Sequence, residues 1–393
     1  MNVLRVLVLL VFATCAAAAS LSVSIEGVPA GSARIAITNH AGVSAYITAP
    51  TEFLDLPDGH YSLAAGPVQV GDDIFITPSG TSTFTLQNGA TTEYTVKYLD
   101  VTGSTLYRRN PDFQYCEPGT PSTVGLRRAA DEVNFFRALM GLPILGVIEE
   151  LTTEMQAAAM LYAMNPTVET PHNPPLEAVC WTKQGADTSA VSNLSVVRSS
   201  ADSVFTASPP EEHIRRWFID QDVINLGHRR WLLDPFLPGV AFGYTQGYTT
   251  AGPFADPAHP FAVGASLQVT NLGANPAARS MSQPFVAYPY GEFPATALPE
   301  EWPLFSFSLV VDNTSPQANA SVDYSAAHIT ITDRLGHKVP ITGVSASTAT
   351  FGLPNHLQWR VDRLETGHTY TVSITNIWVK NKRMAFEYPV TLR

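Results

Sequence analysis

Four polar residues in the middle of the chain are the first candidates for chemistry. They are His172 in Glu-Thr-Pro-His, Asn193 in Val-Ser-Asn-Leu, Asp220 in Trp-Phe-Ile-Asp and His228 in Gly-His-Arg-Arg. Two imidazoles and a carboxylate that leave one position open describe a zinc site. The sequence has no Gly-x-Ser-x-Gly, His-Glu-x-x-His, phosphate-loop or dinucleotide-binding motif. The common hydrolase and nucleotide-binding classes are therefore disfavoured.

Each candidate also has a purely structural interpretation. A loop histidine satisfied by backbone hydrogen bonds would explain His172, and a helix-cap or core histidine would explain His228. An ion pair with one of the two arginines after His228 would explain Asp220, since buried carboxylates are often paired for architectural reasons. Asn193 is most simply a turn residue. The residue types alone leave catalysis, binding and structure open.

Helical spacing predicts how Asp220 is oriented. His213, Trp217 and Asp220 fall at i, i+4 and i+7, so we expect them on one helix face, with Asp220 directed inward beside Trp217. A carboxylate on an otherwise apolar face needs a partner, because burying it unpaired is costly. His228, eight residues later, is placed to supply that partner.

Three helices are predicted to carry these residues. The first covers residues 122–140 and stops at Gly-Leu-Pro, and the second covers residues 149–165. The third begins near Ser208, where Ser208 and Glu211 have the spacing of a capping box and Pro209 suits the first helical position. Strand patterns return after residue 231, so we expect an α+β unit over residues 116–275.

Both flanking segments are predicted to be β-domains. Residues 20–105 and 291–393 alternate apolar and polar positions in short runs separated by turn residues. Tyr61 and Tyr370 each follow a turn and begin a strand, which is a feature of Ig-like sandwiches. Residues 276–290, rich in Pro and Ala, are predicted to be a linker.

Composition narrows the class of protein. A chain of 393 residues predicts two or three domains, and 45% hydrophobic against 15% charged residues excludes disorder as the main state. The net charge of −11 disfavours a nucleic-acid partner, which prefers a basic face. Residues 1–19 resemble a secretory signal peptide, because the apolar run Val6–Ala19 is only 14 residues long and too short to span a bilayer. No later segment has the pattern of a transmembrane helix.

The cysteines predict one disulfide. Cys15 lies within the predicted signal peptide, which leaves Cys116 and Cys180 in a compartment where disulfides persist. We expect these two to be paired; the alternative is two unrelated buried thiols.

Three segments resemble the CAP superfamily of cysteine-rich secretory, antigen-five and pathogenesis-related proteins, most closely its secreted microbial branch. They are Glu-Val-Asn-Phe-Phe-Arg-Ala-Leu-Met-Gly-Leu-Pro, Trp-Phe-Ile-Asp-Gln-Asp and, above all, Asn-Leu-Gly-His-Arg-Arg-Trp-Leu-Leu. The resemblance covers residues 122–275. It implies an α-β-α sandwich whose large cleft holds two histidines and two acidic residues, which bind a divalent metal in some members.

Position by position, the resemblance assigns His172 and His228 as the two histidines and Asp220 as the second acidic residue. Where the family commonly has Gly-Glu-Asn-Leu, this chain has Val-Ser-Asn-Leu, so Ser192 replaces the first acidic residue. A neutral hydroxyl is neither a carboxylate base nor an anionic ligand. We therefore expect zinc binding through His172, Asp220 and His228 to be weak, and no intrinsic hydrolytic turnover.

The combined prediction is an α+β chain with a central CAP-type α-β-α sandwich flanked by two Ig-like β-sandwich domains. The expected function is that of a secreted, non-catalytic protein that binds a lipid, sterol, glycan or protein through the cleft. The two alternatives are a metal-assisted hydrolase that uses the His/Asp cleft and a structural or adhesive surface protein.

Overall fold

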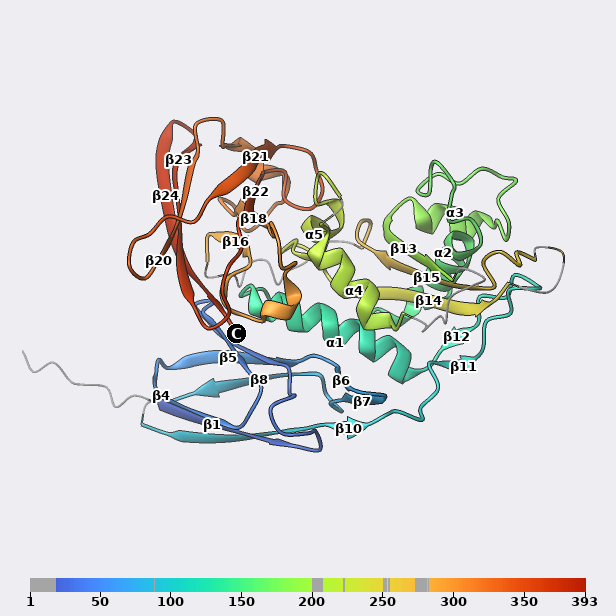
Figure 1. Ribbon diagram of the computed structural model, residues 1–393, viewed down its shortest axis with the longest axis horizontal. Coiled ribbons are helices and arrows are strands. Elements are labelled where there is room, and N and C mark those ends of the chain that lie inside the picture. The colour runs from blue at the N-terminus through green and yellow to red at the C-terminus, as the bar shows by residue number, and fades with distance from the viewer. Residues whose placement is uncertain are drawn as a thin grey trace, which may run out of the picture.

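The computed structural model describes residues 19–87, 89–199, 208–221, 223–249, 253, 255–272, 281 and 283–393. The predicted signal peptide up to residue 18, with Cys15, lies outside these residues. The chain is mostly β, with 40% strand and 18% helix, arranged as several small sheets (Figure 1). No helix in the described ranges is long and apolar enough to cross a membrane.

The N-terminal part forms three small sheets that share one hydrophobic core. Their strand orders are β4-β1-β9, β3-β2-β5-β8 and β10-β7-β6. The Tyr61 hydroxyl donates a hydrogen bond to the Pro57 carbonyl (2.9 Å), which ties the turn to the strand that follows it. The strands are β1 Ala19–Glu26, β2 Ile35–Asn39, β3 Ser44–Ile47, β4 Thr51–Leu56, β5 Gly59–Ala65, β6 Val68–Val70, β7 Asp73–Ile76, β8 Thr81–Leu86, β9 Thr91–Lys97 and β10 Leu99–Asp100.

The C-terminal part is built on two sheets, with orders β16-β18-β22-β21 and β17-β24-β23-β19, and with β20 paired to β23. The long hairpin β23/β24 turns through Lys380 and Asn381, both in the left-handed region that tight hairpin turns require. The strands are β16 Phe285–Tyr288, β17 Gly291–Phe293, β18 Leu304–Leu309, β19 Val322–Asp323, β20 His328–Asp333, β21 Ile341–Ser347, β22 His356–Val361, β23 Thr369–Val379 and β24 Lys382–Leu392.

Helix α1 lies between the two β parts, while α2 and α3 lie beside them, with the small antiparallel sheet β13-β15-β14 (Figure 1). Helix α2 packs closely on this sheet because Gly243 and Gly264 have no side chain there. A Cβ at either glycine would lie about 2 Å from the backbone of α2. The elements are β11 Tyr107–Arg109, β12 Thr120–Pro121, α1 Thr123–Leu139, α2 Thr152–Met164, α3 Lys183–Ser189, β13 Ser192–Arg198, α4 Pro210–Ile219, α5 Gly227–Leu232, β14 Ala241–Tyr248 and β15 Phe261–Gln268.

Helix α1 is the central element of the molecule. The Ser122 side chain caps its first turn by accepting from the Gly125 N–H, and the chain leaves it through Gly141 at φ +70°. Thirteen of its 17 residues are buried, because α1 contacts β2 and β5 of the N-terminal part as well as α4 and β14. One hydrophobic core continues from α1 into the C-terminal sheets.

The predicted fold class, a central α-β-α sandwich between two Ig-like β-sandwich domains, is wrong. The chain is predominantly β, and its five helices in the described ranges accompany only one three-stranded sheet. The physical reason is the position of α1, which is enclosed by strands from the N-terminal part. An outer-layer helix of a separate sandwich would expose one face to water.

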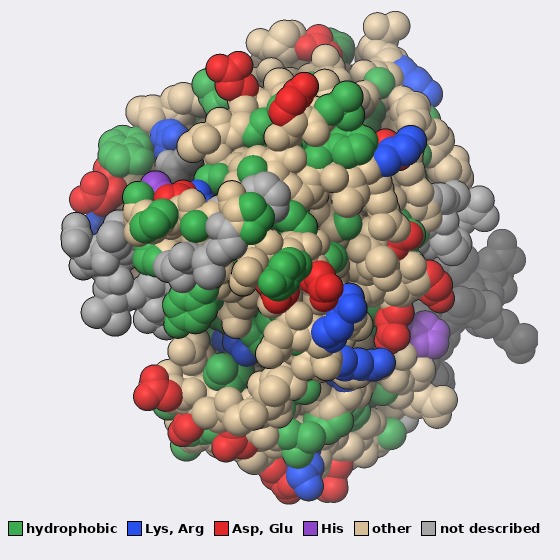
Figure 2. Space-filling view, turned by 90° about the vertical axis from the view of Figure 1, so that its right-hand side faces the viewer, with side chains coloured by type: hydrophobic (Ala, Val, Ile, Leu, Met, Phe, Trp, Pro, Cys, Tyr) green, Lys and Arg blue, Asp and Glu red, His purple; other side chains and the backbone are tan. Residues whose placement is uncertain are grey.

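The surface near α2 and α3 carries charges of both signs. Figure 2 shows acidic and basic side chains interspersed among hydrophobic and polar ones on this side of the molecule. Two pairs of opposite charge lie in this region, Lys183 with Asp187 and Arg198 with Asp256.

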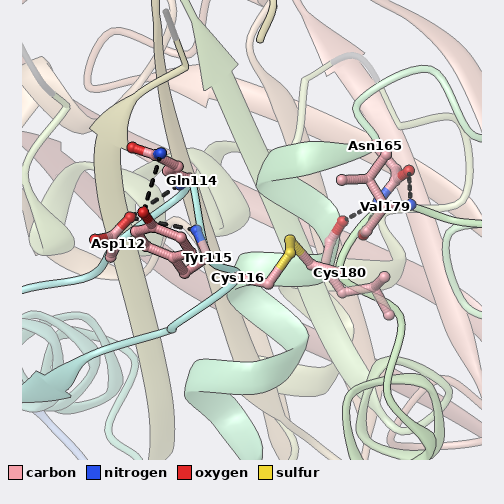
Figure 3. The surroundings of a disulfide bond; sticks show 8 residues. Asp112, Gln114, Tyr115, Cys116, Asn165, Val179 and Cys180 are labelled. Carbon is pink, nitrogen blue, oxygen red and sulfur yellow. Dashed lines mark hydrogen bonds between the residues drawn. A yellow bond between two sulfur atoms is a disulfide. The ribbon is translucent and has the colours of Figure 1, made fainter. Parts of the chain in front are cut away.

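The predicted disulfide between Cys116 and Cys180 is confirmed. The two Cα atoms are 5.2 Å apart, and the bridge joins the segment before α1 to the segment between α2 and α3 (Figure 3). Next to Cys180, the Asn165 side chain bonds both the N–H and the carbonyl of Val179 (2.9 and 2.8 Å). The bridge therefore anchors the irregular segment that contains His172.

Replacing both Cys116 and Cys180 by Ala should lower the free energy of unfolding by about 4 kcal/mol, because the bridge closes a long loop in the unfolded chain. Urea denaturation of the variant and of the oxidised protein measures the difference. Two titratable thiols in the unfolded, unreduced protein would contradict the bridge itself.

Asp234 is a buried carboxyl beside α1. Burial raises the pKa of Asp234 to about 6, while the Phe236 N–H and the nearby Arg137 oppose that shift. Because the folded-state pKa exceeds the unfolded value of about 3.9, the native state binds this proton more tightly. Asp234 therefore contributes stability at acidic pH that is lost as the pH rises through about 6.

Asp234→Asn should remove this pH dependence and retain an acceptor for the Phe236 N–H. Between pH 4 and pH 8 the unfolding free energy of the variant should rise relative to the natural protein by about 2 kcal/mol. Chemical denaturation across this range tests the change. Asp187→Asn, at an exposed carboxylate, is the matched control, and its unfolding free energy should depend on pH as that of the natural protein does. If the unfolding free energy of Asp234→Asn also runs parallel to that of the natural protein, the raised pKa is wrongly assigned to Asp234.

Candidate functional site

A cavity of about 450 Å³ lies where the two predicted histidines meet, and we call it the candidate cavity. His172 comes from the segment before α3, while Ser192 and Asn193 begin β13. His228 and Trp231 come from α5. The structure therefore brings His172, Ser192, Asn193 and His228 together, although 56 positions separate the two histidines.

His172 is held through one ring nitrogen. Its Nδ1 lies 2.8 Å from the Ser189 carbonyl oxygen. A carbonyl only accepts hydrogen bonds, so Nδ1 carries the proton, and the neutral ring has its lone pair on Nε2. No hydrogen-bond partner of Nε2 occurs within the described part of the chain.

His228 is oriented in the same way by a carboxylate. Its Nδ1 lies 2.8 Å from Asp220 Oδ1, and the Arg229 backbone N–H donates to Asp220 Oδ2 (3.1 Å). The Asp220 side chain is only 2% exposed and does not line the candidate cavity. Asp220 is thus a positioning residue, which leaves Nε2 of His228 as the ring's acceptor.

The end of α4 differs from the expectation. The helix stops at Ile219, and Asp220 is its C-cap in the left-handed region at φ 46°, so Asp220 does not continue the helix face of His213 and Trp217. Leu226, which precedes α5, is also left-handed at φ 50°. The left-handed conformation is strained for residues other than glycine. The two hydrogen bonds that the Asp220 carboxylate accepts, from His228 Nδ1 and from the Arg229 N–H, help to hold this turn.

The predicted start of α4 is wrong by one residue. Pro209 is the N-cap and Pro210 the first helical residue, with no side-chain cap. Glu211 makes no capping box with Ser208, because its carboxylate accepts from Arg128 Nε (2.8 Å) of α1 instead. The buried ion pair between Arg128 of α1 and Glu211 of α4 thus takes the place of the expected capping box between Ser208 and Glu211.

Trp217 and Asn193, both expected near the site from the sequence, help to hold His228 in place. The Trp217 ring lies near the His228 ring, with centroids 6.3 Å apart, and its Nε1 donates to the Leu194 carbonyl (3.2 Å). The Asn193 side chain donates to the His228 carbonyl (3.1 Å). The Trp217 bond attaches α4 to β13, and the Asn193 bond attaches α5 to β13. The Ser192 hydroxyl donates to the Thr188 carbonyl (2.8 Å), so its proton is already engaged.

The residues do not fit a metal ion held by His172, Asp220 and His228. Each Asp220 oxygen accepts a hydrogen bond, one from His228 Nδ1 and the other from the Arg229 N–H, and the buried Asp220 side chain does not line the candidate cavity. Within the described ranges, no three His, Cys, Asp or Glu side chains gather in a metal-binding group. The bond from Asp220 orients a histidine, as such bonds also do behind true metal ligands.

The sequence interpretation missed the apolar walls of the cavity. Trp231 lies three positions after His228 in the same helix, so helical spacing could have predicted that the two side chains share one face. Phe351 comes from the C-terminal part, 123 positions after His228, and packs edge-on against Trp231 with centroids 6.3 Å apart. No local pattern marks Phe351, because only the docking of the C-terminal part brings it here.

Comparisons of the chain with protein-family models, with curated proteins and with solved structures find no match.

Proposed function

We propose that this chain is a binding protein whose candidate cavity holds, without turnover, a small and largely apolar molecule bearing a hydroxyl group, such as a sterol or another lipid. One observation carries the proposal. Two imidazoles, each fixed through Nδ1, present their Nε2 atoms as acceptors in a cavity whose other walls are largely apolar.

The size and lining of the cavity support this class of ligand. Its volume of about 450 Å³ falls within the usual range of small-molecule sites. Val191, Val223, Trp231 and Phe351 supply apolar surface. Asn225 and Thr270 add polar groups to the lining, but a glycan would still place several of its hydroxyls against the apolar side chains, which is costly. A sterol or lipid would bury its hydrocarbon there and direct one hydroxyl at the histidines.

The chemistry of the polar groups supports binding over hydrolysis. A metal-assisted hydrolase needs a ligand set and a general base, but the Asp220 oxygens are occupied and the Ser192 hydroxyl donates to a carbonyl. The remaining alternative, a structural or adhesive surface protein, would leave the cavity without a ligand.

We also propose that residues 122–275 are related to the CAP superfamily. The proposal rests on Gly-His-Arg-Arg-Trp-Leu-Leu and on the matches at His172, Asp220 and His228. Secretion is likewise a proposal, based on the apolar run in residues 1–19.

His172→Phe tests the binding proposal best, because it keeps an aromatic ring and removes the Nε2 acceptor. Removing His228 would instead leave the buried Asp220 carboxylate without its partner. Loss of one hydrogen bond of about 1 kcal/mol predicts roughly fivefold weaker binding of a fluorescent sterol. The measurement is the fluorescence anisotropy of that sterol in a titration with the full chain.

His337→Phe is the matched control. His337 also pairs through Nδ1 with a carboxylate, Asp333 Oδ2 (2.9 Å), but it is exposed and lies outside the candidate cavity. This variant should bind the sterol like the natural protein. If the natural protein shows no saturable binding of the sterol or of a hydroxylated lipid, or if both variants lose affinity equally, the proposed function is wrong.

A further inference from the structure

A second, much smaller cavity lies on the other side of α5, and we call it the inner cavity. It has a volume of about 20 Å³ and lies between α5 and the sheet β16-β18-β22-β21. Its polar lining consists of Arg229 and Arg230 from α5, Ser306 and Ser308 from β18, and His356 from β22. This lining is unusual for a buried interface, where polar groups need partners.

Arg230 brings an uncompensated charge to the inner cavity. Its residue is 5% exposed, and its terminal nitrogens bond only neutral groups, the carbonyls of Ala349 and Leu353 and the Ser347 hydroxyl. Its Nε is buried without a hydrogen-bond partner. Among the described residues no carboxylate forms an ion pair with Arg230. A buried guanidinium in this state is costly unless a negative charge is nearby.

The other polar groups add no negative charge. The Arg229 guanidinium bonds the carbonyls of Phe218, Ile219 and Leu304 and lies over the Tyr288 ring. Burial, followed by the charge of Arg230, lowers the pKa of His356 to about 3, so this ring is neutral at physiological pH. The walls thus present two cations and two serine hydroxyls, with no carboxylate.

The size of the inner cavity selects the ligand. A volume of about 20 Å³ is enough for one water-sized species, so it favours a single monatomic ion over a polyatomic anion. A water molecule would bond the Arg230 Nε–H but would leave the charge uncompensated. We propose that the inner cavity binds a single monatomic anion, chloride under ordinary solution conditions, between the Arg230 guanidinium and the β18 hydroxyls.

The anion would stabilise the contact between α5 and the C-terminal part. Arg229 and Arg230 directly follow His228 in the chain, and Phe351 lines both the inner cavity and the candidate cavity. Arg230 also lies near the Phe351 ring, 5.3 Å from its centroid. An anion on Arg230 thus helps to hold one wall of the candidate cavity. The inference does not depend on which ligand, if any, the candidate cavity takes.

Bromide provides the direct test, because it replaces chloride and scatters anomalously. Crystals of the full chain soaked in sodium bromide should show an anomalous peak in the inner cavity, within hydrogen-bond reach of Arg230 Nε and a β18 hydroxyl. Density of an ordered water without anomalous signal, or an empty cavity, would overturn the proposal.

Thermal unfolding gives an independent readout in solution. At equal ionic strength, sodium chloride or bromide should raise the midpoint by about 2 °C over sodium gluconate, whose anion is too large for the inner cavity. Ser308→Val should reduce this halide effect, because it removes a donor and fills space. Ser373→Val, on the separate sheet of β23, is the matched control and should keep the effect. Equal midpoints in all three salts, or an equal halide effect in both variants, would contradict the anion site.

Discussion

The buried charges of α1 are the constraint on which the rest of the structure depends. Glu132 has a fully buried side chain and accepts from Arg34, which directly precedes β2 (2.6 and 3.0 Å), and from Arg215 of α4 (3.3 Å). Removing one member of such a buried set leaves an uncompensated charge, which typically costs about 3–5 kcal/mol. The N-terminal sheet, α1 and α4 are therefore held in one arrangement.

The same principle extends from α1 to the candidate cavity. Arg128 of α1 binds Glu211 of α4, and Arg137 donates to the carbonyls of Leu232, the last residue of α5, and Asp234, just after it (2.8 and 2.9 Å). Charged groups thus attach α1 both to α4, which precedes His228, and to α5, which contains it. Because α4 and α5 are fixed at these points, the turn between them adopts two left-handed residues, and Asp220 comes within reach of the His228 ring.

The site is composite, and its polar and apolar groups have different origins. Its two histidines and their supports come from the middle of the chain, within about 60 positions, and the disulfide anchors the segment of His172. Phe351 comes from the C-terminal part. Arg230 of α5 holds the segment around Phe351 by donating to the carbonyls of Ala349 and Leu353 on either side of it. A change in that docking would alter the wall of the candidate cavity without touching either histidine.

Sequence alone determined those features that depend on local hydrogen bonding and chain connectivity. The Ser122 cap and the Gly141 stop bound α1, and the Pro57 turn precedes β5. The only two cysteines after residue 15 predicted the bridge that joins them. The partnership of Asp220 with His228 was also within reach, because only eight positions separate them. Each of these follows from residues whose preferred conformations or partners lie nearby.

Tertiary structure decided the features that long-range burial controls. Glu211 was free to cap α4 locally, but a buried arginine of α1 engages its carboxylate, and the helix start moved to Pro210. The fold class depended on whether strands would cover the outer face of α1, which amphipathic patterning does not specify. Phe351 and the inner cavity likewise exist only because α5 packs on a distant sheet, and no short-range preference of these residues encodes that contact.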